Sequence, residues 1–145
     1  MRAHVGRIDG TAVLDIVLQS GLDVIDHVPL PVFSAREAYD LIKDSGHYTM
    51  TLAYKHQLAR LVAGHVIMVP TLTAHALWCE APNLTARQTQ GCYEFYEEPV
   101  REFHALGGTV ALANDYGADD TIEKGIPLRE MQLLLAAGLT PMEVI

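Results

Sequence analysis

Cysteines, basic residues and long apolar runs are all scarce in this chain of 145 residues. The only two cysteines, Cys79 and Cys92, lack metal-site spacing, so we expect two reduced, partly buried thiols. The 10 Lys and Arg residues are scattered and the net charge is −8, which argues against nucleic-acid binding, because phosphates need a basic patch. No apolar run approaches the roughly 20 residues of a membrane span, and the first residues lack the apolar stretch of a signal peptide. These absences favour a soluble, cytoplasmic protein with neither nucleic-acid nor membrane partners.

The chain is nevertheless rich in apolar residues. They make up 50% of it, against 19% charged residues, which excludes a disordered chain. The length suits one domain with its own core. This apolar fraction is high for a small α/β domain. We therefore expect further surface of the chain to be buried, either in a homo-oligomer or against a missing part of the same domain.

Strand patterns alternate with helix patterns along the whole sequence. Short apolar runs predict strands at 3–6, 22–25, 66–69 and 109–113. Helical spacing and capping signals predict helices over 11–19, 34–46, part of 47–64, 85–106 and 128–137, and a start at Thr140. We expect 73–83 to be a loop. Because helices separate the strands and no tight hairpin signal is present, the pattern predicts a parallel sheet of βα units.

Four βα units can form an open sheet or half of a (β/α)8 barrel, which typically needs about 250 residues. The sequence begins on a strand and ends in a helix, which favours half a barrel. The whole chain, 1–145, would then be the C-terminal part of one barrel domain.

Metal-competent side chains follow three of the predicted strands. His4, His27 and Asp115 each stand where an apolar run ends. The C-terminal ends of barrel strands converge on one face, and two imidazoles with a carboxylate suit Zn²⁺. The alternatives are a packed histidine bonded to a carbonyl for His27 and a turn or capping aspartate for Asp115. Spacing alone therefore indicates a hydrolytic metal site, with these alternatives open.

The ordered set of motifs resembles the metal-dependent amidohydrolase superfamily, in the branch of imidazolonepropionase and Xaa-Pro or aryl-dipeptidases. The likeness covers nearly the whole chain and is poorest over 47–64. The stretch Gly21–His27 resembles the family's strand 6, which ends in a metal-ligand histidine. The other matching stretches are Met68–Leu72 for strand 7, Gly107–Gly117 for strand 8, Pro127–Ile145 for the helix that follows, and Arg2–Val5 for strand 5.

The resemblance implies strands 5–8 of a TIM barrel, with His4 and His27 as metal ligands and Asp115 as ligand and general base. The metal would be one or two divalent ions, Zn²⁺ by preference. Two departures stand out: Asn114 replaces a residue that is often threonine, and the family's strand-1 and strand-4 ligands have no counterpart. About half of the usual ligand set is therefore present.

The expected reaction is hydrolysis of a C–N bond in an amide, cyclic amide or dipeptide-like small molecule, by a metal-activated water with Asp115 moving the proton. His75 and Tyr116 follow the predicted strands on the same face and are candidate substrate-binding residues, although a solvated loop position would explain each of them. The alternative function is a catalytically inactive half-barrel, which would need a complementary N-terminal half or self-association.

Overall fold

The computed structural model describes residues 2–4, 10–30, 48–117 and 119–145, and for 2–4 and 10–14 it describes the backbone only. The helix predicted over 34–46 lies outside these residues. Three short strands form one parallel sheet in the order β1-β2-β3: β1 (Arg2–His4), β2 (Val24–Asp26) and β3 (Ile67–Val69). The register places Ala3 beside Ile25 and Ile25 beside Met68.

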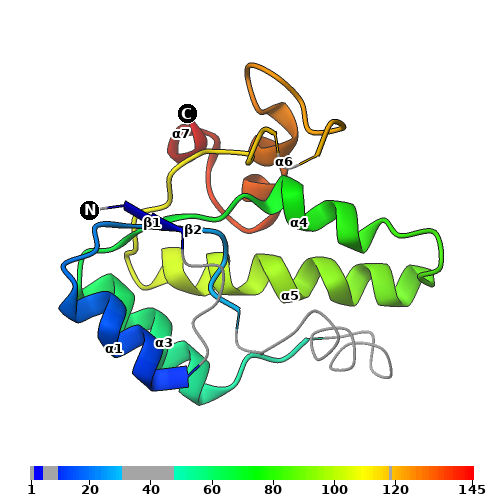
Figure 1. Cartoon of the computed structure of the whole chain (residues 1–145). Helices are drawn as coiled ribbons and strands as arrows, with labels where there is room; N and C mark the ends of the chain where they lie inside the picture. The colour runs from blue at the N-terminus through cyan, green and yellow to red at the C-terminus, as the bar shows by residue number, and fades with distance from the viewer. Residues whose placement is uncertain (1, 5–9, 31–47, 118) are drawn as a thin grey trace.

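The predicted half-barrel of four strands is wrong for the described residues, whose regular structure is mostly helical (Figure 1). Where the fourth strand was expected, over 109–113, only Val110 makes a bridge, to Met68. Two hydrogen bonds accompany it, from Met68 N to Thr109 O and from Ala111 N to Met68 O. Alanines at 111 and 113 have low strand propensity, which explains why the segment pairs at one point without extending.

Local capping signals set the ends of most helices. The first, α1 (Gly10–Gln19), is followed by Gly21 in the left-handed region, a common helix end. Thr51 accepts a hydrogen bond from Tyr54 N and begins α3 (Leu52–Ala63). A capping box of Thr85 and Gln88 begins α5 (Ala86–Ala105).

The last two helices also follow their sequence signals. Pro127 is the N-cap of α6 (Leu128–Ala136). Gly138, with φ of 102°, follows that helix. The Glu143 carboxylate accepts a hydrogen bond from Thr140 N at the start of α7 (Pro141–Val144).

The predicted loop over 73–83 is wrong, because the segment begins with a helix, α4 (Leu72–Cys79). The helices α4 and α5 pack against each other, and α3 and α6 also contact α5, the longest helix in Figure 1. The core lies between these helices and the sheet. Its most deeply buried side chains are Ile25, Met68, Leu58, Leu61, Phe95, Val100, Phe103 and Leu134. None of the helices within the described ranges combines the length and apolar character that a transmembrane helix requires.

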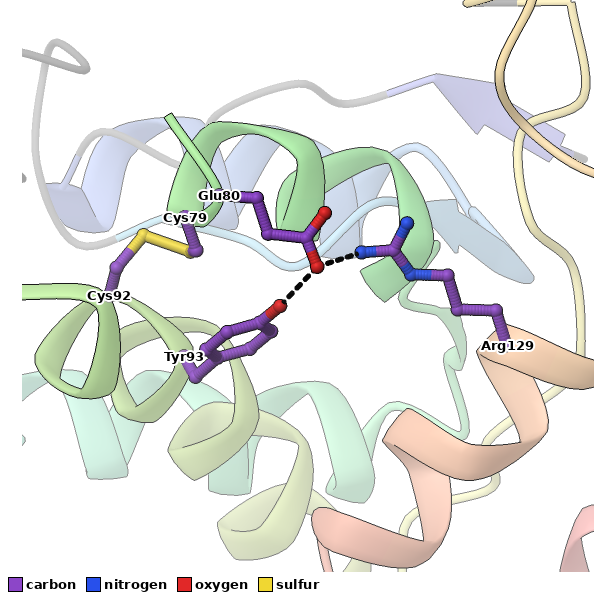
Figure 2. Close-up of a disulfide and its surroundings, with 5 residues drawn as sticks. All are labelled: Cys79, Glu80, Cys92, Tyr93 and Arg129. Carbon is purple, nitrogen blue, oxygen red and sulfur yellow. Dashed lines mark hydrogen bonds and ion pairs between the residues drawn. A yellow bond between two sulfur atoms is a disulfide. The ribbon is translucent and has the colours of Figure 1, made fainter. Parts of the chain in front are cut away.

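Cys79 and Cys92 form a disulfide, so the prediction of two free thiols is wrong. The bond joins the last residue of α4 to the second turn of α5, with the two Cα atoms 5.4 Å apart (Figure 2). The error follows from the missed helix, because only the pairing of α4 with α5 brings the two cysteines together.

Candidate functional site

A pocket of about 390 Å³ opens beyond the C-terminal ends of the parallel strands. Three of the predicted site residues line it: His27, His75 and Asp115. They come from the end of β2, from α4 and from the loop after Val110. The other lining residues are Ala74, Leu77, Trp78, Asp119 and Ile122. Parallel sheets commonly bind ligands at this edge, because the connections there are free to carry polar groups.

A hydrogen-bond chain fixes the tautomer of His27. Its Nδ1 atom lies 2.6 Å from Thr71 Oγ1, and that hydroxyl donates to Pro70 O at 2.7 Å. Because the hydroxyl proton is committed to Pro70, Oγ1 accepts the His27 Nδ1–H. In the neutral ring, Nε2 is then the atom with the lone pair, which is the form of imidazole that binds a metal.

Three residues around the pocket have left-handed backbone conformations that are rare for residues other than glycine. They are His27, Thr71 and Asp115, with φ of 70°, 51° and 56°. Histidine and aspartate tolerate this region better than a β-branched residue does, so Thr71 is the strongest outlier. Such conformations cost about 1–3 kcal/mol each and cluster at functional sites. Here they turn the chain sharply as it leaves β2 and β3.

Asp115 is held in place by its neighbour. Asn114 is buried, and its Nδ2 donates to Glu123 O at 2.9 Å, which ties the loop after Val110 to the segment before α6. Asp115 itself is partly exposed and lines the pocket. Asn114 thus anchors the loop that presents the Asp115 carboxylate.

His75 is enclosed by two aromatic rings. It stacks on Tyr96 with the ring centres 4.4 Å apart, and it meets His27 edge-on at 5.8 Å. Its Nε2 is buried and has no hydrogen-bond partner within the part of the chain that the structure describes. Burial, with a smaller contribution from His27, lowers the pKa of His75 to about 4, so the ring is neutral near pH 7.

Trp78, Ile122 and Asp119 were not predicted as site residues. Trp78 lies one turn after His75 on α4 and is 60% exposed, which is unusual for the only tryptophan of the chain. Ile122 is buried beneath the pocket. The Asp119 carboxylate accepts hydrogen bonds from Thr121 N and Oγ1, which lower its pKa and keep it ionised. As the only tryptophan of the chain, Trp78 was the one feature of the sequence that could have drawn attention to α4.

Two consecutive residues of α6 hold both ends of α4. The buried Glu130 accepts hydrogen bonds from Leu72 N at 2.8 Å and from Thr73 N at 2.6 Å, and so caps the first turn of α4. Arg129 donates to Glu80 at the other end, where Tyr93 of α5 also donates to Glu80, beside the disulfide (Figure 2). These contacts fix the helix that carries His75 and Trp78.

Two further predicted residues do not join the site in the same way. Tyr116 is 56% exposed and is not among the residues lining the pocket; Lys124 Nζ lies 5.4 Å from its ring centre. The backbone of His4 pairs with Asp26 at the strand end next to His27, but its side chain lies outside the described part of the chain. The roles predicted for both residues stay predictions.

The described side chains fit a divalent metal only in part. The His27 Nε2 lone pair and the Asp115 carboxylate are the donor types that Zn²⁺ takes. Among the described side chains, however, no three His, Cys, Asp or Glu residues form a group that could hold a metal ion. A complete site would need at least one more ligand, and His4 is the predicted one.

Comparison with models of known protein families, with curated proteins and with solved structures found no match to this chain.

Proposed function

We propose that the chain is a metal-dependent hydrolase of C–N bonds that acts on amides, cyclic amides or dipeptide-like small molecules. The observation that carries the proposal is the meeting of His27 and Asp115 in one pocket beyond the parallel strands, with the Nε2 lone pair of His27 fixed by Thr71. His4, His27 and Asp115 would hold the metal, with Zn²⁺ preferred to harder ions because two of the three ligands are imidazoles. One or two ions are compatible with this ligand set.

A bound divalent metal would polarise the amide carbonyl and acidify the attacking water. Asp115 would take the proton of that water on a carboxylate oxygen and pass it to the leaving nitrogen, because it is the partly exposed acid in the pocket. His27 would hold its position through Thr71. The apolar side chains of Leu77 and Ile122 would exclude bulk water from part of the pocket.

The first experiment measures metal content by elemental mass spectrometry on the purified chain, coupled to size exclusion with light scattering. Near-stoichiometric zinc, together with hydrolysis of any member of an amide, cyclic amide and dipeptide panel, would support the proposal. A monodisperse chain that takes up no divalent ion and cleaves none of the panel would contradict it.

A second candidate is a chain without activity of its own that works in association with another chain or a second copy. The observation in its favour is the sheet, since β1 pairs only with β2, and the Val110 segment only with Met68, among the described residues. Exposed strand edges promote association. Light scattering in the same experiment separates this candidate from a self-sufficient monomer.

A cytoplasmic location remains part of the proposal, and the disulfide weighs against it. Cytosolic thiols are kept reduced, whereas disulfides persist in oxidising compartments. The test is rapid alkylation of thiols in intact cells, followed by mass spectrometry of the peptides containing Cys79 and Cys92. Alkylated cysteines would support the cytoplasm, and a protected pair would contradict it.

A further inference from the structure

Thr71 begins α4 without capping it, in contrast to two other threonines of the chain. Thr51 and Thr85 begin α3 and α5 in extended conformations, and the side chain of each accepts a backbone N–H of its helix. That is the usual arrangement for an N-cap threonine. Thr71 instead has a left-handed backbone, with φ of 51° and ψ of 46°, and makes no side-chain capping bond. Its hydroxyl is bonded to His27 Nδ1 and to Pro70 O.

The buried Glu130 caps this helix instead. Its two carboxylate oxygens accept one backbone N–H each, from Leu72 at 2.8 Å and from Thr73 at 2.6 Å, and the Thr73 hydroxyl donates a third hydrogen bond at 2.7 Å. Thr73 is the second residue of α4, and the N–H at that position is one that an N-cap side chain normally binds. Glu130 therefore holds a donor that the Thr71 hydroxyl would otherwise accept.

The Thr71 hydroxyl thus has two competing uses. To cap α4, Thr71 would adopt the extended conformation, in which its Oγ1 faces the Thr73 N–H and no longer lies beside His27. The left-handed region is unfavourable for a β-branched residue, so Thr71 on its own favours the capping conformation. Because Glu130 already binds the Thr73 N–H, that conformation gains no hydrogen bond there, and the hydroxyl stays with His27.

We propose that Glu130 is a positioning residue for His27: it caps α4 in place of Thr71, and so leaves the Thr71 hydroxyl to orient the imidazole and to hold its proton on Nδ1. Glu130 is not among the described residues that line the pocket, so it acts through Thr71. The consequence, zinc binding at His27 Nε2, rests on the proposed function. The tautomer of the ring is a property of the metal-free chain and can be measured without that function.

The test measures the His27 tautomer by long-range ¹H–¹⁵N NMR of the metal-free chain, at a pH where the ring is neutral. We expect the Nδ1–H form to dominate in the wild type and to become the minor form in Glu130→Gln, since a histidine without a partner on Nδ1 favours the proton on Nε2. Thr73→Val is the matched control: it removes one hydrogen bond to Glu130 but keeps both backbone bonds, so the Nδ1–H form should stay dominant. An unchanged tautomer in Glu130→Gln, or the same loss in both variants, would overturn the proposal.

A second variant keeps the test decisive if Glu130→Gln fails to fold. Thr71→Val removes the hydroxyl, so the Nδ1–H form should lose its dominance. Amide hydrogen exchange at Leu72 and Thr73 should stay as slow as in the wild type, because Glu130 still caps both amides. Exchange that is faster by about tenfold or more at these amides would show that Thr71 itself caps α4, and would overturn the proposal.

Tautomer and exchange are read without metal or turnover, so this proposal and the proposed function can fail separately. A chain with the expected tautomers that binds no zinc would support the positioning role and contradict the hydrolase. If the chain binds zinc, Glu130→Gln should bind it about 10- to 100-fold more weakly than the wild type and Thr73→Val equally well. Equal zinc affinity in Glu130→Gln and the wild type would support the metal site and overturn the positioning role.

Discussion

The Nδ1 atom of His27 lies 2.6 Å from Oγ1 of Thr71, and the two residues stand at the ends of neighbouring parallel strands. The contact is non-local, since 44 residues separate them in the sequence. Both residues have a left-handed backbone, where the chain leaves its strand. The sheet register therefore sets the orientation of the imidazole.

Replacing Thr71 by valine should weaken zinc binding by about 10- to 100-fold, because the ring loses the partner that orients it and fixes its tautomer. The measurement is a zinc titration in competition with a chelator. Thr71→Ser is the matched control, since it keeps the hydroxyl and lacks the β-branch that is strained at this φ. Equal zinc affinity in the valine variant and the wild type would contradict the role of the contact.

Asp115→Asn should lower amide hydrolysis by at least about 100-fold, because the side chain can no longer accept the proton. Asparagine is the appropriate replacement, since it also tolerates the left-handed conformation at φ of 56°, and stability should change by less than about 1 kcal/mol. Asp120→Asn, an exposed change on the same loop and outside the pocket lining, is the control. Near wild-type rates in Asp115→Asn would contradict the proposed proton transfer by Asp115.

Glu130→Gln should destabilise the chain by about 1–3 kcal/mol, since the amide nitrogen would face backbone donors at the start of α4. Urea unfolding followed by circular dichroism measures the loss. Glu98→Gln is the control: it alters an ion pair with Arg101 that is partly exposed, so its effect should be below about 1 kcal/mol. Similar small effects for both variants would contradict the capping role of Glu130.

The disulfide between Cys79 and Cys92 closes a loop with a sequence separation of 13. Replacing both cysteines by alanine should cost about 3 kcal/mol, chiefly because the unfolded chain regains the freedom that the crosslink removes. Denaturant unfolding of the oxidised wild type and of the double variant measures the difference. Addition of a reductant should lower the stability of the wild type alone; a response of the double variant would show that the reductant acts elsewhere.

Stability should fall as the pH drops from about 6.5 to about 4. The pKa of His75 is lowered to about 4 in the folded chain, so within this range the unfolded chain binds a proton that the folded chain does not. The difference corresponds to about 3 kcal/mol for this one residue. Unfolding curves of the metal-free chain, with a chelator present, measure it. His75→Phe should show a shallower slope, and an unchanged slope would contradict the assignment.

Most helices could be predicted from the sequence because their signals are local. Thr85 with Gln88 and Thr140 with Glu143 are neighbours along the chain, so the pattern of residue types contains the whole cap. α4 could not be predicted in this way. Its N-cap Thr71 makes no side-chain capping bond, and its capping carboxylate comes from Glu130, more than 50 residues away. Only the folded arrangement of α6 reveals that cap.

Of the residues predicted to form a site, three line the pocket: His27, His75 and Asp115. His27 and Asp115 follow apolar runs, and the structure brings both into one pocket. Trp78 lies on α4, the helix that the sequence did not predict, and Asp119 lies in a polar loop. Neither residue directly follows an apolar run. The fold class failed for a related reason: four apolar runs look alike in the sequence, but 109–113 pairs only at Val110.

Arg129 and Glu130 are adjacent in the sequence, yet they reach opposite ends of α4. A one-residue insertion or deletion early in α6 would rotate both side chains by about 100° and release both ends of α4 together. One mutation of this kind would therefore remove the contacts at both ends of α4. Changes that preserve the register of α6 can alter its exposed face freely, whereas a length change there would displace His75 and Trp78 at once.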